Sequence, residues 1–336
     1  MIGLGQSDLA SALGLRTQHA KIRAALDITS KELASGKKTD LVKATGGDLG
    51  RLFSIERSLA QFSTEKHAIN IAQGKTALMQ LSMGQIQDNL SDYGPELLSA
   101  VNRGDQNAMR IISADGRNKL DAAVSAMNAR YGRHSVFAGA AVDRAALAPA
   151  DDIFNDIAVI VAAAADAPTA IAAIDAYFFA PGGGFETNIY LGAPADSPPF
   201  IDEGGTKTDY SIRADSLEVR QSLRAFAMAA VASQDPGFAG TNDQVLLLRE
   251  AAISSISTTG DIIKSRETLG FAEGSIADAQ ARNIAKTSVF ELERNAILAA
   301  DPYESATMFE ALQGQLQSVY TITARLSNLN LTNFLR

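Results

Sequence analysis

Apolar side chains near both ends of the chain recur in alternating steps of three and four residues. The N-terminal series contains Ala12, Leu15, His19, Ile22, Leu26, Thr29 and Leu33. The C-terminal series contains Phe309, Leu312, Leu316, Val319, Thr323 and Leu326. Such steps align side chains along one helical face and are typical of coiled coils. The pattern predicts one long amphipathic helix over about residues 8 to 35 and another near the C-terminus.

Local signals mark where these two helices end and begin. Gly36 can adopt the left-handed conformation that closes a helix, and Lys37 and Lys38 suit its negative end. Asp301 is placed to cap the C-terminal helix, with Pro302 as its first residue and Glu304 completing a capping-box-like arrangement. We therefore expect a break in the chain before Pro302.

Two further helical stretches lie inside these ends. The first runs from about residue 49 to 131, with interruptions expected at Tyr93-Gly94-Pro95 and Gly104-Asp105. The second runs from about residue 241 to 300. Its apolar positions recur in sevens or multiples of seven, with small alanines between them: Leu269, Ala272, Ile276, Ala279, Phe290 and Ile297. Charged residues elsewhere on both stretches predict partly exposed helices.

The middle of the chain, residues 139–239, differs in character. An alanine-rich helical region over 151–179 precedes a passage with Gly182-Gly-Gly184 and Pro198-Pro199. Glu186–Leu191 and Thr208–Arg213 are short strand candidates. We expect a mixed α+β insertion that forms a separate surface knob.

Together these segments predict a mainly α protein. Its expected architecture is an elongated antiparallel helical bundle or coiled coil built from both chain ends, with the small insertion in the middle. The predicted domains are terminal coiled-coil segments at 1–40 and 303–336, a helical rod core at 41–138 and 240–302, and the insertion at 139–239.

Composition narrows the class of protein. The 336 residues are alanine-rich and poor in aromatics, with a net charge of −8 that disfavours nucleic acid as a partner. The absence of cysteine excludes disulfides, thiolate nucleophiles and cysteine-ligated metals. The N-terminus lacks the pattern of a cleavable secretory signal. The longest apolar run, Ile157–Ala165, is far shorter than the roughly 20 residues that span a bilayer, so no membrane insertion is expected.

No catalytic, cofactor or metal site is predicted. His19, His67 and His134 are scattered and do not have ligand spacing. Gly182-Gly-Gly184 lacks the Gly-Lys-Ser/Thr ending of a phosphate-binding loop, which favours a flexible turn. Helix-start capping accounts for Asp48 and Asp151 better than a metal site does. We expect a protein that is not an enzyme and carries no cofactor.

The C-terminal seam is nearly free of charge. No charged residue occurs between Ala311 and Ala324, where Gln, Ser and Thr fill the positions off the seam. Such a face can be buried against similar faces without stranding charges, which predicts an assembly interface. The predicted interface residues are Leu15, Ile22, Leu26, Leu33, Phe309, Leu312, Leu316, Val319 and Leu326. Ordinary packing of the two ends within one chain explains the same pattern equally well.

Several segments, in this order, resemble bacterial flagellins and flagellar hook-associated proteins. They are the N-terminal seam ending in Ser35-Gly36-Lys37, Val136-Phe-Ala-Gly139, Arg213-Ala-Asp215 before Glu218-Val-Arg220, Asp301-Pro-Tyr-Glu-Ser-Ala306, and Arg325-Leu-Ser-Asn-Leu-Asn-Leu331. The hook–filament junction type, hook-associated protein 3, is the nearer match. The resemblance covers about 140 N-terminal and about 125 C-terminal residues. One departure is Thr39-Asp-Leu41, where the family usually has Asp-Asp-Pro; Gly46-Gly47-Asp48 can supply a turn and cap instead.

The resemblance implies a structural subunit exported through the flagellar type III pathway, without a cleavable signal, to the extracellular flagellum. It implies hook-side hook-associated protein and flagellin as partners, self-association in a ring or helical layer, and an export chaperone. Flagellin, the filament subunit, is the alternative within the family. A cytosolic coiled-coil scaffold or signalling protein is the alternative outside it.

Overall fold

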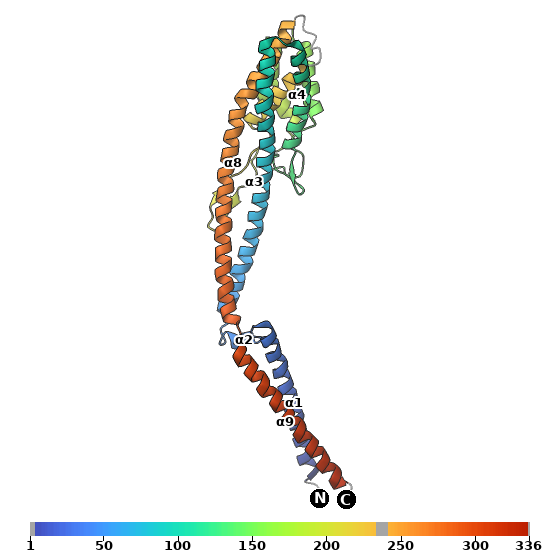
Figure 1. Cartoon of the computed structure of the whole chain (residues 1–336), viewed down its shortest axis with the longest axis vertical. Helices are drawn as coiled ribbons and strands as arrows, with labels where there is room; N and C mark the ends of the chain where they lie inside the picture. The colour runs from blue at the N-terminus through green and yellow to red at the C-terminus, as the bar shows by residue number, and fades with distance from the viewer. Residues whose placement is uncertain (1–3, 233–240, 335–336) are drawn as a thin grey trace. The chain divides into compact units, whose positions relative to one another are not determined.

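The computed structural model describes the backbone of residues 4–232 and 241–334, and the side chains of residues 13–232 and 242–325. The described chain is mainly α-helical, with two small two-stranded antiparallel sheets (Figure 1). This confirms the predicted mainly α fold class with a small mixed insertion. The chain divides into two compact units, one joining 1–63 to 284–336 and the other comprising 64–283.

The first unit is built from both ends of the chain. Its elements are α1 (Leu4–Ser35), α2 (Leu41–Ala44), the beginning of α3 (Gly50–Arg103), the end of α8 (Thr241–Leu298) and α9 (Pro302–Phe334). Helices α1 and α9 lie side by side and run in opposite directions (Figure 1). The included parts of α3 and α8 meet through an edge-to-face contact between Phe62 and Phe290, with ring centroids 5.3 Å apart.

The second unit holds most of the hydrophobic core. It contains the rest of α3 and α8 with α4 (Gln106–Met127), α5 (Ala150–Ala163), α6 (Ala167–Phe179), the π-helical turn η1 (Phe185–Ile189) and α7 (Leu217–Ala232). The core-facing side of α3 repeats in steps of three and four, and includes Met79, Met83, Ile86 and Leu90. On α8, Leu269, Ala272, Ile276 and Ala279 are buried, as the sevenfold repeat predicts.

Helix α7 is buried on nearly all sides. Phe226 packs edge-to-face on Tyr93 of α3, with ring centroids 5.8 Å apart, and burial raises the pKa of that tyrosine. Gly116 of α4 allows the close approach of α7, because an added Cβ would lie 2.9 Å from the backbone nitrogen of Ala230. The alanines of α7 therefore permit dense packing against α4 from a helix with few large side chains.

One predicted helix interruption is confirmed and the other is wrong. Gly104 has φ +66°, and the Asp105 carboxylate caps α4 by accepting a hydrogen bond from Ala108 N at 3.0 Å. In contrast, α3 continues through Pro95. Next to Pro95, α3 lies close against α8, because a Cβ added to Gly94 would lie 2.9 Å from Ile256 Cγ1. Packing on α8 thus overrides the local signal.

The predicted end of the same helical stretch, at about residue 131, is also wrong. Helix α4 ends at Met127, and β1 (Arg130–Tyr131) then pairs antiparallel with β2 (His134–Ser135). Gly132 lies between the strands with φ +62°, a conformation that favours a tight turn.

Both strand candidates of the insertion need correction. Residues 185–189 of the first form η1, because the Glu186 carboxylate folds back to accept a hydrogen bond from Gly182 N at 2.9 Å. Of the second candidate, only Thr208 belongs to a strand, β4 (Lys207–Thr208), which pairs antiparallel with β3 (Phe200–Ile201). Ser211 N donates to the Asp209 carboxylate at 3.0 Å, which is a local turn contact.

The middle of the chain shares its core with the inner helices. Ile153 and Phe178, from α5 and α6, belong to the same buried cluster as Leu120 of α4 and Leu269 of α8. The domain boundaries inferred from the sequence stay a prediction.

Candidate assembly interface

The end of α1 forms as its sequence predicts. Gly36 has φ +65° and its N–H donates to the Glu32 carbonyl at 2.8 Å, which closes the helix after Ser35. The following residues bind the end of α8: Lys38 N donates to Leu298 O at 2.7 Å, and Ala300 N donates to Gly36 O at 3.0 Å. The residues that follow α1 are therefore hydrogen-bonded to the segment that leads into α9.

The start of α9 is also the predicted one. Helix α8 ends at Leu298 and α9 begins at Pro302. The Asp301 carboxylate accepts hydrogen bonds from Tyr303 N at 2.8 Å and Glu304 N at 3.2 Å. The expected break and cap are confirmed, and together they let α9 return alongside α1.

The packed seam of the α1–α9 pair is narrow. Its buried apolar residues are Ile22, Leu312 and Val319, and the partly buried residues packed on them are Leu15, Ala25, Leu26 and Leu316. Thr29 and Ser305 are also buried, and the Thr29 hydroxyl donates to Ala25 O at 2.9 Å. Six of the nine predicted interface residues thus contribute to one seam within a single chain.

The remaining three predicted residues lie elsewhere. Leu33, near the C-terminal end of α1, is 42% exposed, so the seam is not covered there. Phe309 is half-buried, outside the central cluster. Leu326 lies outside the residues whose side chains the structure describes.

A polar cluster borders the seam. His19 Nε2 lies 3.1 Å from the Tyr320 hydroxyl, and the two rings meet edge-to-face. Arg23 also donates to that hydroxyl at 3.3 Å. These contacts give His19 a packing role at the seam, which is the role its seam position suggested.

Much apolar surface on the pair remains uncovered. The large exposed apolar side chains of α1 and α9 within the described side chains are Leu13, Ile28, Leu33, Tyr303, Met308, Tyr320 and Ile322. On the adjacent α2, Leu41 and Val42 are exposed too. Sequence periodicity did not single out Ile28, Met308 or the α2 pair, because they lie off the three-four series. Their hydrophobicity outside the seam was the available signal.

A groove runs between α1, α2 and the start of α9. It encloses about 530 Å³ and has Ala25, Ile28, Met308 and Leu312 among its apolar lining. Glu32, Lys38, Asp40, Lys43, Asp301 and Glu304 contribute charged groups to the lining. The lining is therefore mixed, with both apolar and charged side chains.

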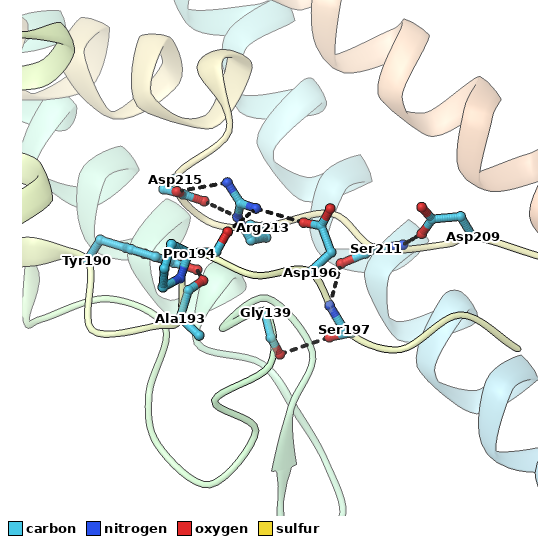
Figure 2. Close-up of polar contacts among 10 residues, drawn as sticks. All are labelled: Gly139, Tyr190, Ala193, Pro194, Asp196, Ser197, Asp209, Ser211, Arg213 and Asp215. Carbon is cyan, nitrogen blue, oxygen red and sulfur yellow. Dashed lines mark hydrogen bonds and ion pairs between the residues drawn. The ribbon is translucent and has the colours of Figure 1, made fainter. Parts of the chain in front are cut away.

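Two family-like motifs that are distant in sequence meet in the second unit. The Phe137 carbonyl accepts a hydrogen bond from Ala214 N at 2.9 Å, which joins Val136–Gly139 to Arg213–Asp215. Arg213 then donates from Nε to Asp215 at 2.7 Å, and from Nη1 to Pro194 O at 2.7 Å and to Asp196 at 2.8 Å (Figure 2). We refer to Arg213, Pro194, Asp196 and Asp215 as the Arg213 network.

Close approach in this region requires Gly139. Its φ is +59°, and an added Cβ would lie 2.4 Å from the carbonyl oxygen of Ala195. The Ser197 hydroxyl donates to the Gly139 carbonyl at 2.8 Å, which fixes the same turn (Figure 2). The network closes the base of the middle segment where the chain leaves and returns, and its charges are satisfied within the protein.

The other residues that the sequence analysis weighed as possible binding or metal sites have structural roles. Gly182 has φ +71° and its N–H is bonded to Glu186, so this glycine lies in a turn. Asp48 accepts from Gly50 N at 2.8 Å, as a cap. The capping prediction for Asp151 is wrong, because α5 has no side-chain cap and Asp151 pairs with Arg117.

The described residues contain no cluster of three or more His, Cys, Asp or Glu side chains with the geometry to hold a metal ion. No helix over the described part of the chain is long and apolar enough to cross a bilayer.

No protein-family model and no curated protein matches the sequence. Among solved structures, the chain is similar to a protein of Vibrio parahaemolyticus provisionally described as a flagellar hook-associated protein, with 11% identity and a TM-score of 0.42. The match covers 70% of the present chain and 94% of that chain. This degree of likeness is below that of a shared fold, and no function follows from it.

Proposed function

We propose that the chain is a non-enzymatic structural subunit of the bacterial flagellum, an adaptor at the hook–filament junction that assembles through its terminal helices. The observation that carries this proposal is the α1–α9 pair. Among the described side chains, its internal contact buries the apolar residues Ile22, Leu312 and Val319, and it leaves other large apolar side chains in solvent.

Energetics favour an additional partner for this pair. Each fully buried apolar side chain contributes about 1.5–3 kcal/mol, whereas ordering each residue costs about 1–2 kcal/mol of backbone entropy. Helices α1 and α9 have 32 and 33 residues, so a short seam offsets little of that cost. Long isolated helices are marginal in water. Neighbouring subunits that cover Leu13, Leu33 and Ile322 would supply the missing burial.

The charge-poor face of α9 fits the same role. No charged residue occurs from Ala311 to Ala324, so subunits can pack on this face without desolvating an ion. Amide groups such as those of Gln313 and Gln317 can hydrogen-bond to similar groups on a neighbour. A tube wall made of such helices would transmit torque through packed seams rather than through a few exposed ion pairs.

The sequence motifs indicate which assembly this is. Asp301-Pro302 forms a working helix cap, and Val136–Gly139 meets Arg213–Asp215, so these family-like motifs have defined structural roles. On this proposal the partners are a hook-side hook-associated protein and flagellin, with an export chaperone before assembly. The location is the flagellum outside the cell, reached by type III export.

Immunogold labelling of intact flagella tests the proposal. Antibodies against this chain should label a single spot at the distal end of the hook. A deletion strain should make hooks without filaments and should secrete flagellin as monomer. Labelling along the whole filament would instead identify a flagellin, and unlabelled flagella would overturn both flagellar functions.

Limited proteolysis of the purified protein separates assembly from a cytosolic scaffold role. An assembly subunit should lose about 40 N-terminal and about 35 C-terminal residues rapidly at low concentration, because its terminal pair has little burial of its own. A scaffold that functions as a folded monomer or dimer should keep both ends resistant. Resistance at low concentration would count against the flagellar proposal.

A further inference from the structure

Within the second unit, α8 carries another three-four series, on the side that faces away from the core. Its apolar and small members are exposed, except for the half-buried Gly270, and two further steps hold Arg249 and Glu267. The apolar and small members are Leu246, Ile253, Ile256, Gly260, Ile263 and Gly270. This is the spacing of a coiled-coil seam, yet Ile253 at its centre is 45% exposed. We call the whole series from Leu246 to Gly270 the outer seam of α8.

Two glycines of the outer seam have no packing role within the chain. A Cβ added at Gly260 would meet no described atom within 4 Å, and one added at Gly270 would lie 3.9 Å from the Gln80 amide nitrogen, an ordinary contact. Both glycines have helical backbone, so neither serves a left-handed turn. Glycine destabilises a helix interior relative to alanine, and its benefit is close approach by other atoms. These positions therefore indicate a partner with large side chains opposite them.

A second copy of α8, running in the opposite direction, supplies such side chains. The steps of the outer seam are 3-4-3-4-3-4-3, which read the same from either end. In an antiparallel pair the two seams meet in reverse order, so this seam matches itself step for step. The facing apolar pairs are then Leu246 with Gly270, Ile253 with Ile263, and Ile256 with Gly260. Both glycines thus receive a large aliphatic side chain.

The charged steps of the seam select the antiparallel copy. Arg249 and Glu267 are exposed, and neither forms an ion pair with a described side chain. In the antiparallel register, Arg249 of each copy faces Glu267 of the other, which makes two ion pairs. In a parallel pair each of these residues would face its own equivalent, and facing like charges are unfavourable.

Charges beside the seam agree with the same register. Antiparallel pairing brings the same flank of the two helices together, which places Glu250 of one copy near Lys264 of the other. These two charges are opposite, and each also has an ion pair within its own chain. The other flanking charges between residues 243 and 273, which are Asp243, Arg266 and Glu273, come opposite uncharged side chains. Like charges therefore do not meet along this part of the pair.

We propose that two copies of the free protein pair through the outer seams of α8, antiparallel about a two-fold axis at position 258. Each copy uses the same surface, so the contact is closed and ends at a dimer. The inference goes beyond the proposed function and does not rest on it. Antiparallel copies point in opposite directions, so this contact belongs to the free protein and not to neighbours that share one direction along a filament.

Cysteine pairs test the register, because the natural chain has no cysteine. On oxidation, the Ile253→Cys/Ile263→Cys variant of the full chain should form a covalent dimer closed by two disulfides, without larger species. A disulfide requires Cα atoms within about 7 Å. The two positions are ten residues apart, about 15 Å along the helix, so they cannot be joined within one chain. An absence of covalent dimer, or a ladder of larger species, would overturn the contact.

Two controls make the cysteine test specific. Each single variant should stay uncrosslinked, because the equivalent positions of an antiparallel pair also lie about 15 Å apart. Leu246→Cys/Ile263→Cys keeps both cysteines on the outer seam but one heptad out of register. It should give at least about tenfold less covalent dimer than the matched pair. Crosslinked single variants would show a parallel pair, and equal yields from the two double variants would show unspecific collision. Either result would overturn the proposed register.

Charge exchange provides an independent test. Arg249→Glu alone and Glu267→Arg alone should each weaken the dimer of the full chain at least about tenfold in sedimentation equilibrium, because both facing pairs become like charges. Mixing the two variants should restore the dimer, since both facing pairs are then opposite charges. The two side chains are exposed, so circular dichroism should show an unchanged fold. Variants that dimerise as tightly as the natural chain, or a mixture that does not recover, would overturn the pairing of Arg249 with Glu267.

The dimer and the flagellar function can fail separately. A covalent dimer of the matched cysteine variant, together with unlabelled flagella, would support the contact and overturn the function. Labelled hook ends together with a matched cysteine variant that stays uncrosslinked would overturn the contact and leave the function standing.

Discussion

The α1–α9 pair and the α4–α7 packing of the second unit use helices in opposite ways. Helix α7 is buried almost all round, from Ser222 to Ala232. Helix α9 buries one narrow stripe through Leu312 and Val319, and exposes most of its remaining described surface. Helix α9, with 33 residues, is twice as long as α7, with 16, yet it buries a much smaller share of its surface. The two helices differ in how many neighbouring helices each has within its own chain: α7 packs on α4, α5 and α6, whereas α9 packs on α1.

This difference separates self-sufficient structure from structure that needs a partner. A helix covered on all sides has no free face on which another molecule could change its stability. A helix covered on one stripe gains stability from any partner that buries the rest. The second unit should therefore behave as a folding unit, whereas the α1–α9 pair should respond strongly to concentration and assembly.

The largest expected effect comes from truncating the core of the second unit. Phe226→Ala should lower the free energy of unfolding by about 3–5 kcal/mol, because it removes a fully buried ring that packs on Tyr93. Urea unfolding followed by circular dichroism measures the change. Phe271→Ala is the matched control, since Phe271 of α8 is 81% exposed and its loss should change stability little. Equal losses in the two variants would contradict the assigned core.

The next effect should be confined to the terminal pair. Leu316→Asp puts a charge on the partly buried apolar seam between Leu312 and Val319. Amide hydrogen exchange should show lost protection in α1 and α9, with protection in α3, α4 and α7 retained. Incorporation into flagella should be abolished.

Gln317→Asp is the control for that charge. Gln317 is adjacent in sequence but exposed, so the monomer should keep its α1–α9 protection. Normal motility in the Leu316→Asp strain would remove the seam from the assembly mechanism. Loss of protection throughout the second unit would show that the two regions do not differ as described.

The structural features that depend on local sequence signals were the most predictable part of this molecule. The stop at Gly36, the cap at Asp301 and the seam through Ile22 and Leu312 each depend on a few neighbouring residues or on simple periodicity. At Pro95 the local signal failed: α3 continues through the proline where Gly94 packs closely on Ser255 and Ile256 of α8, which are far along the chain. The strand predicted from Glu186 failed because that side chain binds a backbone N–H in a preceding turn.

The Arg213 network and the groove could not be predicted from spacing. The two motifs of the network were recognised singly, but their meeting depends on the path of the intervening segment. Likewise, Ile28 and Met308 are separated by most of the sequence and come together only when α9 returns along α1. Leu33 matched the seam pattern yet is exposed, since periodicity identifies a face without specifying whether a partner in the same chain covers it.

An intermediate effect is expected at the Arg213 network, which joins distant segments of the second unit. Arg213→Lys keeps the charge but loses the two-pronged contact with Asp215 and the bond to Pro194 O. Stability to urea should fall by about 1–2 kcal/mol, because several charge-assisted bonds are lost at a half-buried site. Arg144→Lys is the control, since Arg144 is exposed and pairs with the neighbouring Asp143. Equal stability of the Arg213→Lys variant and the natural chain would contradict an anchoring role.

The smallest effect should come from the β3–β4 turn and should depend on pH. Asp202 accepts a hydrogen bond from Thr206 N at 2.8 Å, and its other oxygen lies 2.9 Å from Arg282 Nη2. The backbone N–H of Thr206 foremost, and then Arg282, hold the pKa of this carboxyl below its ordinary value of 3.8.

A depressed pKa in the folded state means that the charged form of Asp202 stabilises the fold above pH 3.8, and that this contribution is lost as the pH falls through the lower folded value. Asp202→Asn should therefore cost at most about 1 kcal/mol at pH 7, because Arg282 is mostly exposed to screening solvent. The difference from the natural chain should stay constant down to about pH 5 and then shrink under acid. Thermal unfolding at a series of pH values measures it, with Asp209→Asn as a carboxylate control outside the ion pair. A difference that instead grew as the pH fell would reverse the inferred sign, and would mean that protonated Asp202 is the form the turn prefers.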